Sequence, residues 1–205
     1  MGALSDVDQS RIEAAVSAAE RRTNAEFAVV VARASDDYAE YPLLWAAVSA
    51  LLAGGVVALL WTALPALTLF VGQAAAFLVV AVVLLSLPDR ARLAPRRARE
   101  ARVDAMADLQ FAARVASRTK DSVGVLLYVS LAEHVAEVRV DQRIAEAVPD
   151  ATWPALIDAL VRRIRAGDLP GGLVAAVEAC AAALAPKFPP TPGQADEITN
   201  RVAEV

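Results

Sequence analysis

The chain has 205 residues, 57% of them hydrophobic, with a formal net charge of −4 and a single cysteine. The acidic balance excludes nucleic acid as the main partner, because surfaces that bind nucleic acid are rich in Lys and Arg. The lone Cys180 excludes an intramolecular disulfide, and its Ala-rich helical surroundings predict a small core residue rather than a catalytic thiol.

The first 40 residues predict one helix and one strand. Ser5 is a suitable helix cap, and acidic residues follow it in the first turn, where the positive end of the helix dipole favours them. Apolar residues then recur at helical spacing from Ile12 to Ala19. The segment Glu26–Ala32 is apolar without alternation, which indicates a strand that is covered on both faces.

The stretch from Tyr41 to Pro88 contains no charged residue and no histidine. As one helix it would be roughly 70 Å long, more than twice the thickness of the hydrocarbon core of a bilayer. Prolines 42, 65 and 88 divide it into equal intervals of 23 residues, and proline breaks helices. We therefore expect a hairpin of two membrane-spanning helices, Leu43–Ala63 and Leu67–Leu87.

Two other kinds of segment can also be this apolar: a buried helical hairpin and a signal peptide. Adjacent core helices of a soluble protein are rarely this apolar over this length, which disfavours a buried hairpin. The 40 residues that precede the stretch are inconsistent with the position of a signal peptide.

Six arginines follow the second span closely, whereas the turn between the spans has no Lys or Arg, so the positive-inside rule places both termini in the cytoplasm. These arginines are Arg90, Arg92, Arg96, Arg97, Arg99 and Arg102.

The remaining residues predict helices and two further strands. The segment Val123–Ser130 is again apolar throughout, whereas Val135–Val140 alternates and is expected to be half-exposed and antiparallel to it. Helices are expected from Pro95 to about Ser117, over Arg143–Val148, from Thr152 to Gly167, and from Pro170 to Pro186. The mostly polar tail Asp196–Val205 is expected to be loosely held.

The order of these elements predicts an α/β fold, with a small mixed β-sheet and packed helices, interrupted by the two-helix transmembrane hairpin. The first two strands are joined through a helix and are therefore expected to be parallel. Residues 1–40 and 89–188 would form the two parts of one soluble domain, residues 41–88 the hairpin, and residues 189–205 a linker and tail.

The soluble part resembles the TPM domain, a family named for thylakoid-lumen, photosystem-repair and receptor-modulating proteins. The resemblance rests on an ordered set of segments rather than on one motif. The set comprises Leu4-Ser5, Asn24–Val31, Val123–Ser130, Val135–Asp141, Trp153, Gly167-Asp168 and Gly171-Gly172-Leu173. Asp141–Ile144 and Lys187-Phe188-Pro189 resemble the bacterial, membrane-anchored branch, which implies location in the cell inner membrane.

Two functions are implied by this resemblance. Some members are associated with assembly, repair or quality control of membrane complexes, which implies an interaction module with the lipid bilayer and another membrane protein as partners. Others are associated with acid phosphatase activity that depends on calcium or another divalent metal. Many members carry a Gly-Tyr-Gly-Leu-Glu-like stretch after the third strand, whereas this chain has Val140–Ile144 there, without either glycine.

The residues offer one candidate site for the enzymatic alternative. Asp141 and Glu26 lie at strand ends and would hold Ca²⁺ or Mg²⁺ through oxygen atoms. Arg143 would bind a phosphate bidentately or pair with Asp141, so that Asp141 and Arg143 are the candidate catalytic residues. Since one acid opens the first strand and the other closes an antiparallel strand, both are expected at the same edge of the sheet. His134 is expected as a surface turn residue. A third interpretation is a sensor of anionic lipids built on the arginines that follow the hairpin.

Overall fold

The computed structural model describes residues 4–116, 122–191 and 198–205. The chain divides into two compact units. Residues 1–35 and 100–205 form the first, here called the α/β unit, and residues 36–99 form the second, here called the hairpin unit. The hairpin is thus an insertion between the first strand and the rest of the α/β unit.

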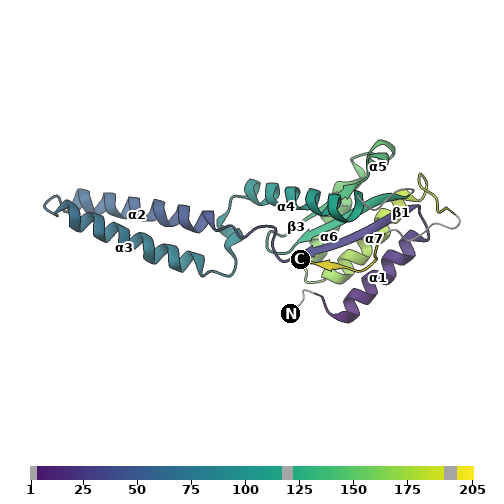
Figure 1. Cartoon of the computed structure of the whole chain (residues 1–205), viewed down its shortest axis with the longest axis horizontal. Helices are drawn as coiled ribbons and strands as arrows, with labels where there is room; N and C mark the ends of the chain where they lie inside the picture. The colour runs from purple at the N-terminus through teal and green to yellow at the C-terminus, as the bar shows by residue number, and fades with distance from the viewer. Residues whose placement is uncertain (1–3, 117–121, 192–197) are drawn as a thin grey trace. The chain divides into compact units, whose positions relative to one another are not determined.

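A four-stranded mixed sheet in the order β3-β2-β1-β4 forms the centre of the α/β unit (Figure 1). The central strands β1 (Ala25–Ala32) and β2 (Val123–Ser130) pair in parallel and are buried over their whole length, as their unbroken apolar sequences predict. β3 (Val135–Val140) is antiparallel to β2 and less buried, as its alternation predicts. The sequence expectations for these three strands are confirmed.

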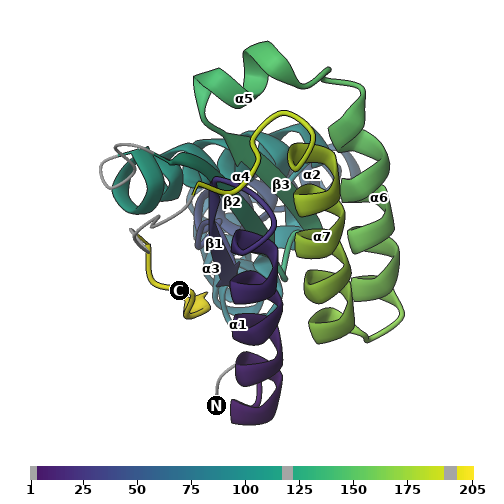
Figure 2. The ribbon, with the colours of Figure 1, turned by 90° about the vertical axis from the view of Figure 1, so that its right-hand side faces the viewer.

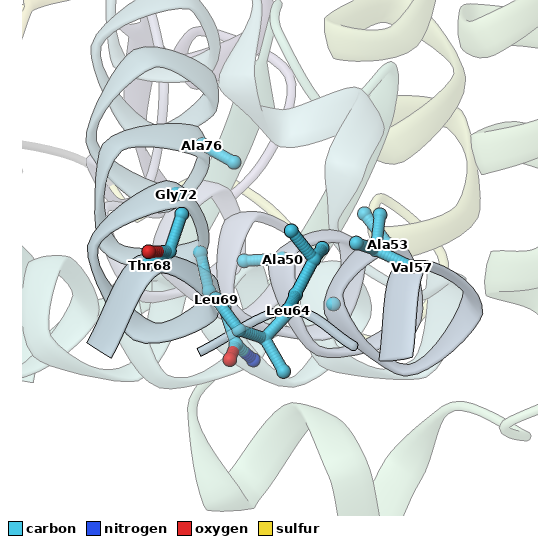
Figure 3. A pocket seen from close by; sticks show the side chains of 10 residues that line it. Ala50, Ala53, Val57, Leu64, Thr68, Leu69, Gly72 and Ala76 are labelled. Carbon is cyan, nitrogen blue, oxygen red and sulfur yellow. The ribbon is translucent and has the colours of Figure 1, made fainter. Parts of the chain in front are cut away.

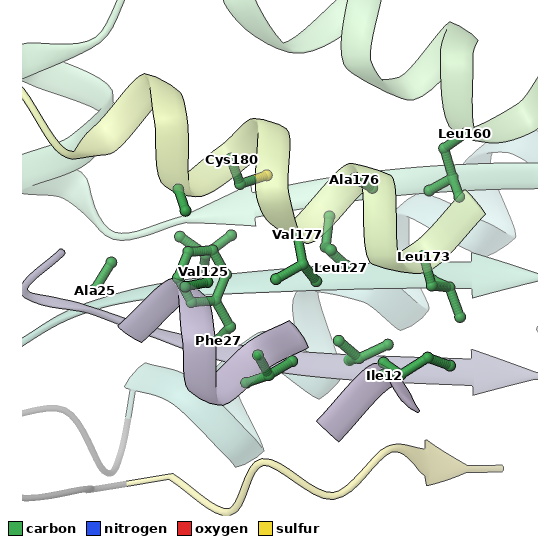
Figure 4. Close-up of a cluster of buried hydrophobic side chains, with 14 of the residues drawn as sticks. Ile12, Ala25, Phe27, Val125, Leu127, Leu160, Leu173, Ala176, Val177 and Cys180 are labelled. Carbon is green, nitrogen blue, oxygen red and sulfur yellow. The ribbon is translucent and has the colours of Figure 1, made fainter. Parts of the chain in front are cut away.

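One face of the sheet is covered by α1 (Asp6–Glu20), α6 (Thr152–Arg165) and α7 (Leu169–Leu184) (Figure 2). Ile12 of α1 and Val177 of α7 are fully buried with Phe27 of β1 and Leu127 of β2 in the larger hydrophobic core (Figure 4). α7 has the most extensive buried face of these three helices, and its inward-facing residues are small or branched and apolar.

The other face is covered by α4 (Arg96–Phe111) and the π-helical turn Ala112–Ala116. Val103 and Ala107 of α4 pack with Val30 of β1 and Tyr128 of β2. Arg139 of β3 adds a polar link, since its guanidinium forms ion pairs with Asp104 and Asp108 of α4 and with Glu137. Burial alone would lower the pKa of Arg139, but the carboxylates of Asp108 and Glu137 outweigh that effect and the pKa is raised.

The C-terminal tail is ordered in its described part, which corrects the expectation of a loosely held tail. Ala203–Glu204 form β4, which pairs in parallel with β1. The backbone N–H of Val205 donates to Val31, and that of Arg33 donates to Val205. Ile198 and Val202 are buried. Without β4, the buried strand β1 would have an unpaired edge. The last residues of the chain therefore provide hydrogen-bond partners for backbone groups of β1, a role that their local sequence does not reveal.

Two long apolar helices, α2 (Glu40–Leu60) and α3 (Ala66–Leu85), make up most of the hairpin unit and pack against each other. Both are long and apolar enough to cross a membrane. They begin and end within a few residues of the helices predicted from the proline spacing. Between them is a groove of about 320 Å³, lined by small and apolar residues that include Ala50, Gly72 and Ala76 (Figure 3).

A short α5 (Gln142–Ala147) and a 3₁₀ turn η1 (Arg90–Leu93) complete the described elements. α5 follows β3 directly and is capped by Asp141. η1 follows α3 and belongs to the hairpin unit.

Candidate functional site

Glu26 and Asp141 lie on either side of Gly124 at one edge of the sheet. In the register of the parallel pair, Glu26 of β1 is opposite Gly124 of β2. On the other side, the backbone N–H of Asp141 donates to the carbonyl of Gly124 at 2.9 Å, which continues the antiparallel pairing of β2 with β3. The two acids are therefore in one row across three strands, with roughly 10 Å between their backbones. The predicted placement of both acids at the same edge is confirmed.

The carboxylate of Glu26 is buried, with only 1% of the residue exposed. Its Oε2 accepts a hydrogen bond from the backbone N–H of Ile198 at 3.2 Å. Glu26 points to the face of the sheet that carries Val30 and Tyr128, because residues two apart on a strand share a face. One function of this carboxylate is thus to hold the C-terminal segment against the sheet.

Asp141 and Arg143 are paired with each other. The Asp141 carboxylate accepts the backbone N–H of Arg143 at 2.8 Å, which caps α5, and the Nε and Nη2 atoms of Arg143 at 3.3 Å. Arg143 also donates to the backbone carbonyl of Ser122, at the start of β2. The side chain of Arg143 is about half exposed, so part of the guanidinium faces solvent.

Glu26 and Asp141 bring two carboxylates to this edge of the sheet, fewer oxygen ligands than Ca²⁺ or Mg²⁺ takes. Calcium takes six to eight oxygen ligands, and magnesium demands an octahedron. Within the described residues, no group of three or more His, Cys, Asp or Glu side chains has the geometry to hold a metal ion. In addition, the Asp141 carboxylate forms an ion pair with the Arg143 guanidinium, and a cation would have to bind that same carboxylate.

A second polar cluster, which the sequence did not predict, lies at the opposite edge, where β1 and β2 end. Ser35, Tyr128, Ser130 and Glu133 are all buried. The Ser35 hydroxyl bonds the Tyr128 hydroxyl at 3.0 Å and donates to that of Ser130 at 2.9 Å. Ser130 in turn donates to Glu133. Burial raises the pKa of the Tyr128 phenol, and the charge of Glu133 acts in the same direction.

Glu133 lies in the turn before β3, beside His134, and its carboxylate is buried. It accepts the backbone N–H of Ser35 at 2.9 Å across 98 residues of sequence. The turn itself is as expected: the neighbouring His134 is exposed, with a φ of 55°. The local signals of this cluster are weak: Ser130 ends β2, and Ser35 follows the end of β1 by three residues.

The Gly167-Asp168 and Gly171-Gly172 pairs form the junction between α6 and α7. Asp168 caps α7 by accepting the backbone N–H of Gly171 at 3.0 Å, and a Cβ at Gly171 would overlap its carboxylate. Arg163 donates to both the Asp168 carboxylate and the Gly171 carbonyl. These residues therefore have a structural role, and so Asp168 is not a free carboxylate for catalysis.

Cys180, which the sequence predicts as a small core residue, is found in the core. Cys180 is fully buried, and burial raises the pKa of its thiol to about 12, which makes the thiol unreactive at neutral pH. Trp153 is packed in the larger core. A cavity of about 50 Å³ lies between α6 and α7, lined by Leu156, Arg163 and Ala179 among others, and touches neither Glu26 nor Asp141.

Comparison with known proteins identifies two similarities. Residues 90–183 match the family model of the TPM domain. The structure is similar to the NMR structure of BA42 protein from the psychrophilic bacterium Bizionia argentinensis, with a TM-score of 0.62 and 19% sequence identity over 99% of this chain and 96% of that chain. At this identity the likeness shows a shared fold. No curated protein matches the chain in sequence.

Proposed function

We propose that this chain, which carries a TPM domain over residues 90–183, is an integral membrane protein whose α/β unit is an interaction module for other membrane proteins, in their assembly or quality control. The hairpin unit anchors it, and the α/β unit operates at the cytoplasmic face of the membrane. The observation that supports the anchoring is the exposure of apolar side chains on α2 and α3.

Both helices expose their apolar surface rather than burying it. Only 17% of the most apolar window of α2 and 6% of that of α3 is buried. Leu59, Leu67 and Phe70 are more than two-thirds exposed, which would be strongly unfavourable in water. In a bilayer the same residues contact lipid tails, and all backbone groups within the spans are satisfied by the helices themselves. A core helix of a soluble protein has the opposite pattern.

The orientation follows from the arginines at positions 90–102, which lie on one side of the two spans, and from the uncharged turn between α2 and α3. The orientation is tested by fusing reporters to residues 1, 63 and 205. Each reporter distinguishes export from a cytoplasmic location. We expect cytoplasmic signals at both ends and an exported signal at Ala63. Release of the chain from membranes by alkaline carbonate would contradict the spanning, and export of either terminus would contradict the orientation.

The interaction role is supported by how the acids of the α/β unit are used. Glu26, Asp141 and Asp168 each make a contact that supports the fold, with Ile198, Arg143 and Gly171 respectively. No metal-binding cluster is present in the part of the chain that the structure describes. These are the properties of a binding domain, which requires a stable surface rather than a group of converging catalytic side chains.

Crosslinking in native membranes tests the interaction role. The full chain is compared with Val30→Asp, which disrupts the α/β unit but leaves the hairpin unchanged. We expect defined membrane-protein partners to crosslink to the full chain only. If the same proteins crosslink equally to both, their binding depends on the hairpin, and the proposed role of the α/β unit is wrong.

The alternative function is a divalent-metal-dependent phosphomonoesterase. It is favoured by one observation, the row of Glu26, Gly124 and Asp141 with Arg143 beside it. In that function Arg143 would release Asp141 and bind the phosphate. Assay of the purified full chain with a generic phosphomonoester and Ca²⁺, Mg²⁺ or Mn²⁺ tests this alternative.

Three variants make the assay specific. We expect Asp141→Asn and Glu26→Gln to abolish any activity of this site, and the exposed Asp150→Asn, a matched control, to retain it. Activity that survives in both site variants would remove Glu26 and Asp141 from catalysis. Absence of activity with all three cations would exclude the phosphatase function.

A further inference from the structure

All basic residues of the hairpin unit lie between positions 90 and 99, directly after α3. They occupy the turn η1 and the first turn of α4, within ten residues of chain. The other end of the hairpin, between α2 and α3, has no charged residue. The five residues are Arg90, Arg92, Arg96, Arg97 and Arg99.

Contacts with α2 hold η1 beside the first turns of that helix. The indole N–H of Trp45 on α2 donates to the backbone carbonyl of Leu93 at 3.1 Å. Ala91 and Ala94 are buried, and η1 packs against α2. Trp45 itself is about half exposed, and indole rings favour the headgroup level of a bilayer. The arginines of η1 are therefore fixed at the depth that Trp45 marks.

The guanidinium groups of the arginines between positions 90 and 99 have more hydrogen-bond donors than the hairpin unit supplies acceptors. Arg92 pairs with Asp89 at 2.6 Å, yet its side chain is 74% exposed. Within residues 36–99, Arg90 and Arg97 have no side-chain hydrogen bond or ion pair, and Arg97 is exposed. The Nε atom of Arg99 is buried without an acceptor, and Oδ1 of Asp89 is buried without a donor. An anion with several oxygen atoms would satisfy the unpaired guanidinium donors.

We propose that Arg90, Arg92, Arg97 and Arg99 bind the phosphate groups of anionic phospholipids of the bilayer that the hairpin spans. The proposal rests on the proposed membrane anchoring. Guanidinium groups bind phosphate oxygens bidentately, and each basic residue close to an anionic surface adds to the attraction. The orientation of the hairpin requires only positive charge during insertion, whereas this site requires guanidinium geometry in the folded protein.

The triple variant Arg90→Gln, Arg92→Gln, Arg97→Gln tests the proposal in the full chain. Arg96, Arg99 and Arg102 remain and keep the charge bias that orients the hairpin. The matched control is Arg21→Gln, Arg162→Gln, Arg165→Gln, which removes the same charge from exposed positions of the α/β unit. Each protein is purified in detergent and titrated with phosphatidylglycerol or phosphatidylcholine, and retained lipid is measured by native mass spectrometry.

We expect the wild type and the control to prefer phosphatidylglycerol and to be thermally stabilised by it. The triple variant should lose tenfold or more in affinity, since about 1 kcal/mol for each of three arginines corresponds to on the order of 100-fold. The same three positions changed to Lys keep the charge but lose the bidentate geometry, and should bind at an intermediate level. Added salt should weaken the binding of phosphatidylglycerol.

Two results would overturn the proposal: equal retention of phosphatidylglycerol by the triple variant and the control, or no preference of the wild type for phosphatidylglycerol. Carbonate extraction of the same membranes separates this outcome from a failure of anchoring. A wild type that resists extraction but shows no lipid preference refutes the lipid site alone. A wild type that is extracted refutes the anchoring, and the lipid site with it.

Discussion

The buried carboxylate of Glu133 accepts the backbone N–H of Ser35 at 2.9 Å, although the two residues are 98 positions apart in sequence. Ser35 is the last residue of the α/β unit before the chain enters the hairpin unit. The bond therefore ties the end of this segment of the α/β unit to the turn that precedes β3.

Glu133→Ala should destabilise the α/β unit by about 2–4 kcal/mol, because the Ser35 N–H and the Ser130 hydroxyl lose their acceptor while buried. Glu133→Gln retains one acceptor oxygen and should cost less. Urea unfolding of the full chain in detergent measures both, with the exposed His134→Ala as control. Equal stability of Glu133→Ala and the control would show that the network does not stabilise the fold.

Val30→Asp should destabilise the α/β unit by several kcal/mol. Val30 is fully buried on the face of the sheet that α4 covers, and an unpaired charge there is strongly unfavourable. The matched control is Val7→Asp, since Val7 is 78% exposed on α1. Circular dichroism and limited proteolysis should show loss of structure in the first variant only. The same test applied to residues 95–189 alone should show no stable fold, because β1 is missing from the centre of the sheet.

Gly54→Leu and Gly55→Leu should differ, although the two glycines are adjacent on α2. A Cβ at Gly54 would lie 3.0 Å from Cδ of Gln73 on α3, whereas nothing lies within 4 Å of one at Gly55. We expect Gly54→Leu to separate α2 from α3 at a cost of roughly 1–3 kcal/mol, and Gly55→Leu to be tolerated. Thermal unfolding in detergent compares them. Equal melting temperatures would argue against the observed facing of the two helices.

Gly171→Ala should remove the cap of α7, because the new methyl group displaces the Asp168 carboxylate. The expected cost is about 1–2 kcal/mol, similar to that of Asp168→Ala. The double variant should cost little more than either single change, since both remove the same hydrogen bond. Additive costs in chemical unfolding would show that Gly171 is needed for another reason.

Stability should fall as the pH rises above about 9, and Cys180 should contribute to the loss. Burial raises its pKa from 9.0 to about 12, so the folded protein keeps the thiol protonated while the unfolded chain releases the proton. The contribution is present below pH 9 and is lost between pH 9 and 12, with an upper limit of about 4 kcal/mol.

Cys180→Ala removes this component, so its stability should decline less steeply over the same pH range. As an independent measurement, the native thiol should resist iodoacetamide at pH 8 and react only after unfolding. Rapid labelling of the native protein would contradict the burial of Cys180.

Much of the fold could be predicted from local pattern. The unbroken apolar runs Glu26–Ala32 and Val123–Ser130 predicted buried parallel strands, and alternation predicted the half-exposed Val135–Val140. The proline spacing located α2 and α3 because proline is tolerated in the first turn of a helix but not in its interior. In the candidate site, the chain reversals were enough to place Glu26 and Asp141 at one edge of the sheet.

The tail and the buried polar cluster could not be predicted in this way. Residues 198–205 have no strand pattern of their own, and Ala203–Glu204 join the sheet only because β1 offers a free edge. Glu133 resembles any acid in a polar turn until the fold brings the Ser35 N–H to it. Similarly, the hydrogen bond between Glu26 and Ile198 depends on a contact between distant segments. The pairing of Asp141 with Arg143 depends on the direction of the two side chains.

The sequence by itself thus determined the strands β1 to β3, the main helices, their order and the apolar hairpin, because hydrophobic periodicity, proline and charge act over a few residues at a time. Only the tertiary structure decided which polar groups are buried and whom they contact. The buried hydrogen bonds of Glu133 with Ser35 and of Glu26 with Ile198 need a partner that the fold supplies from far along the chain, so no short stretch of sequence contains both members.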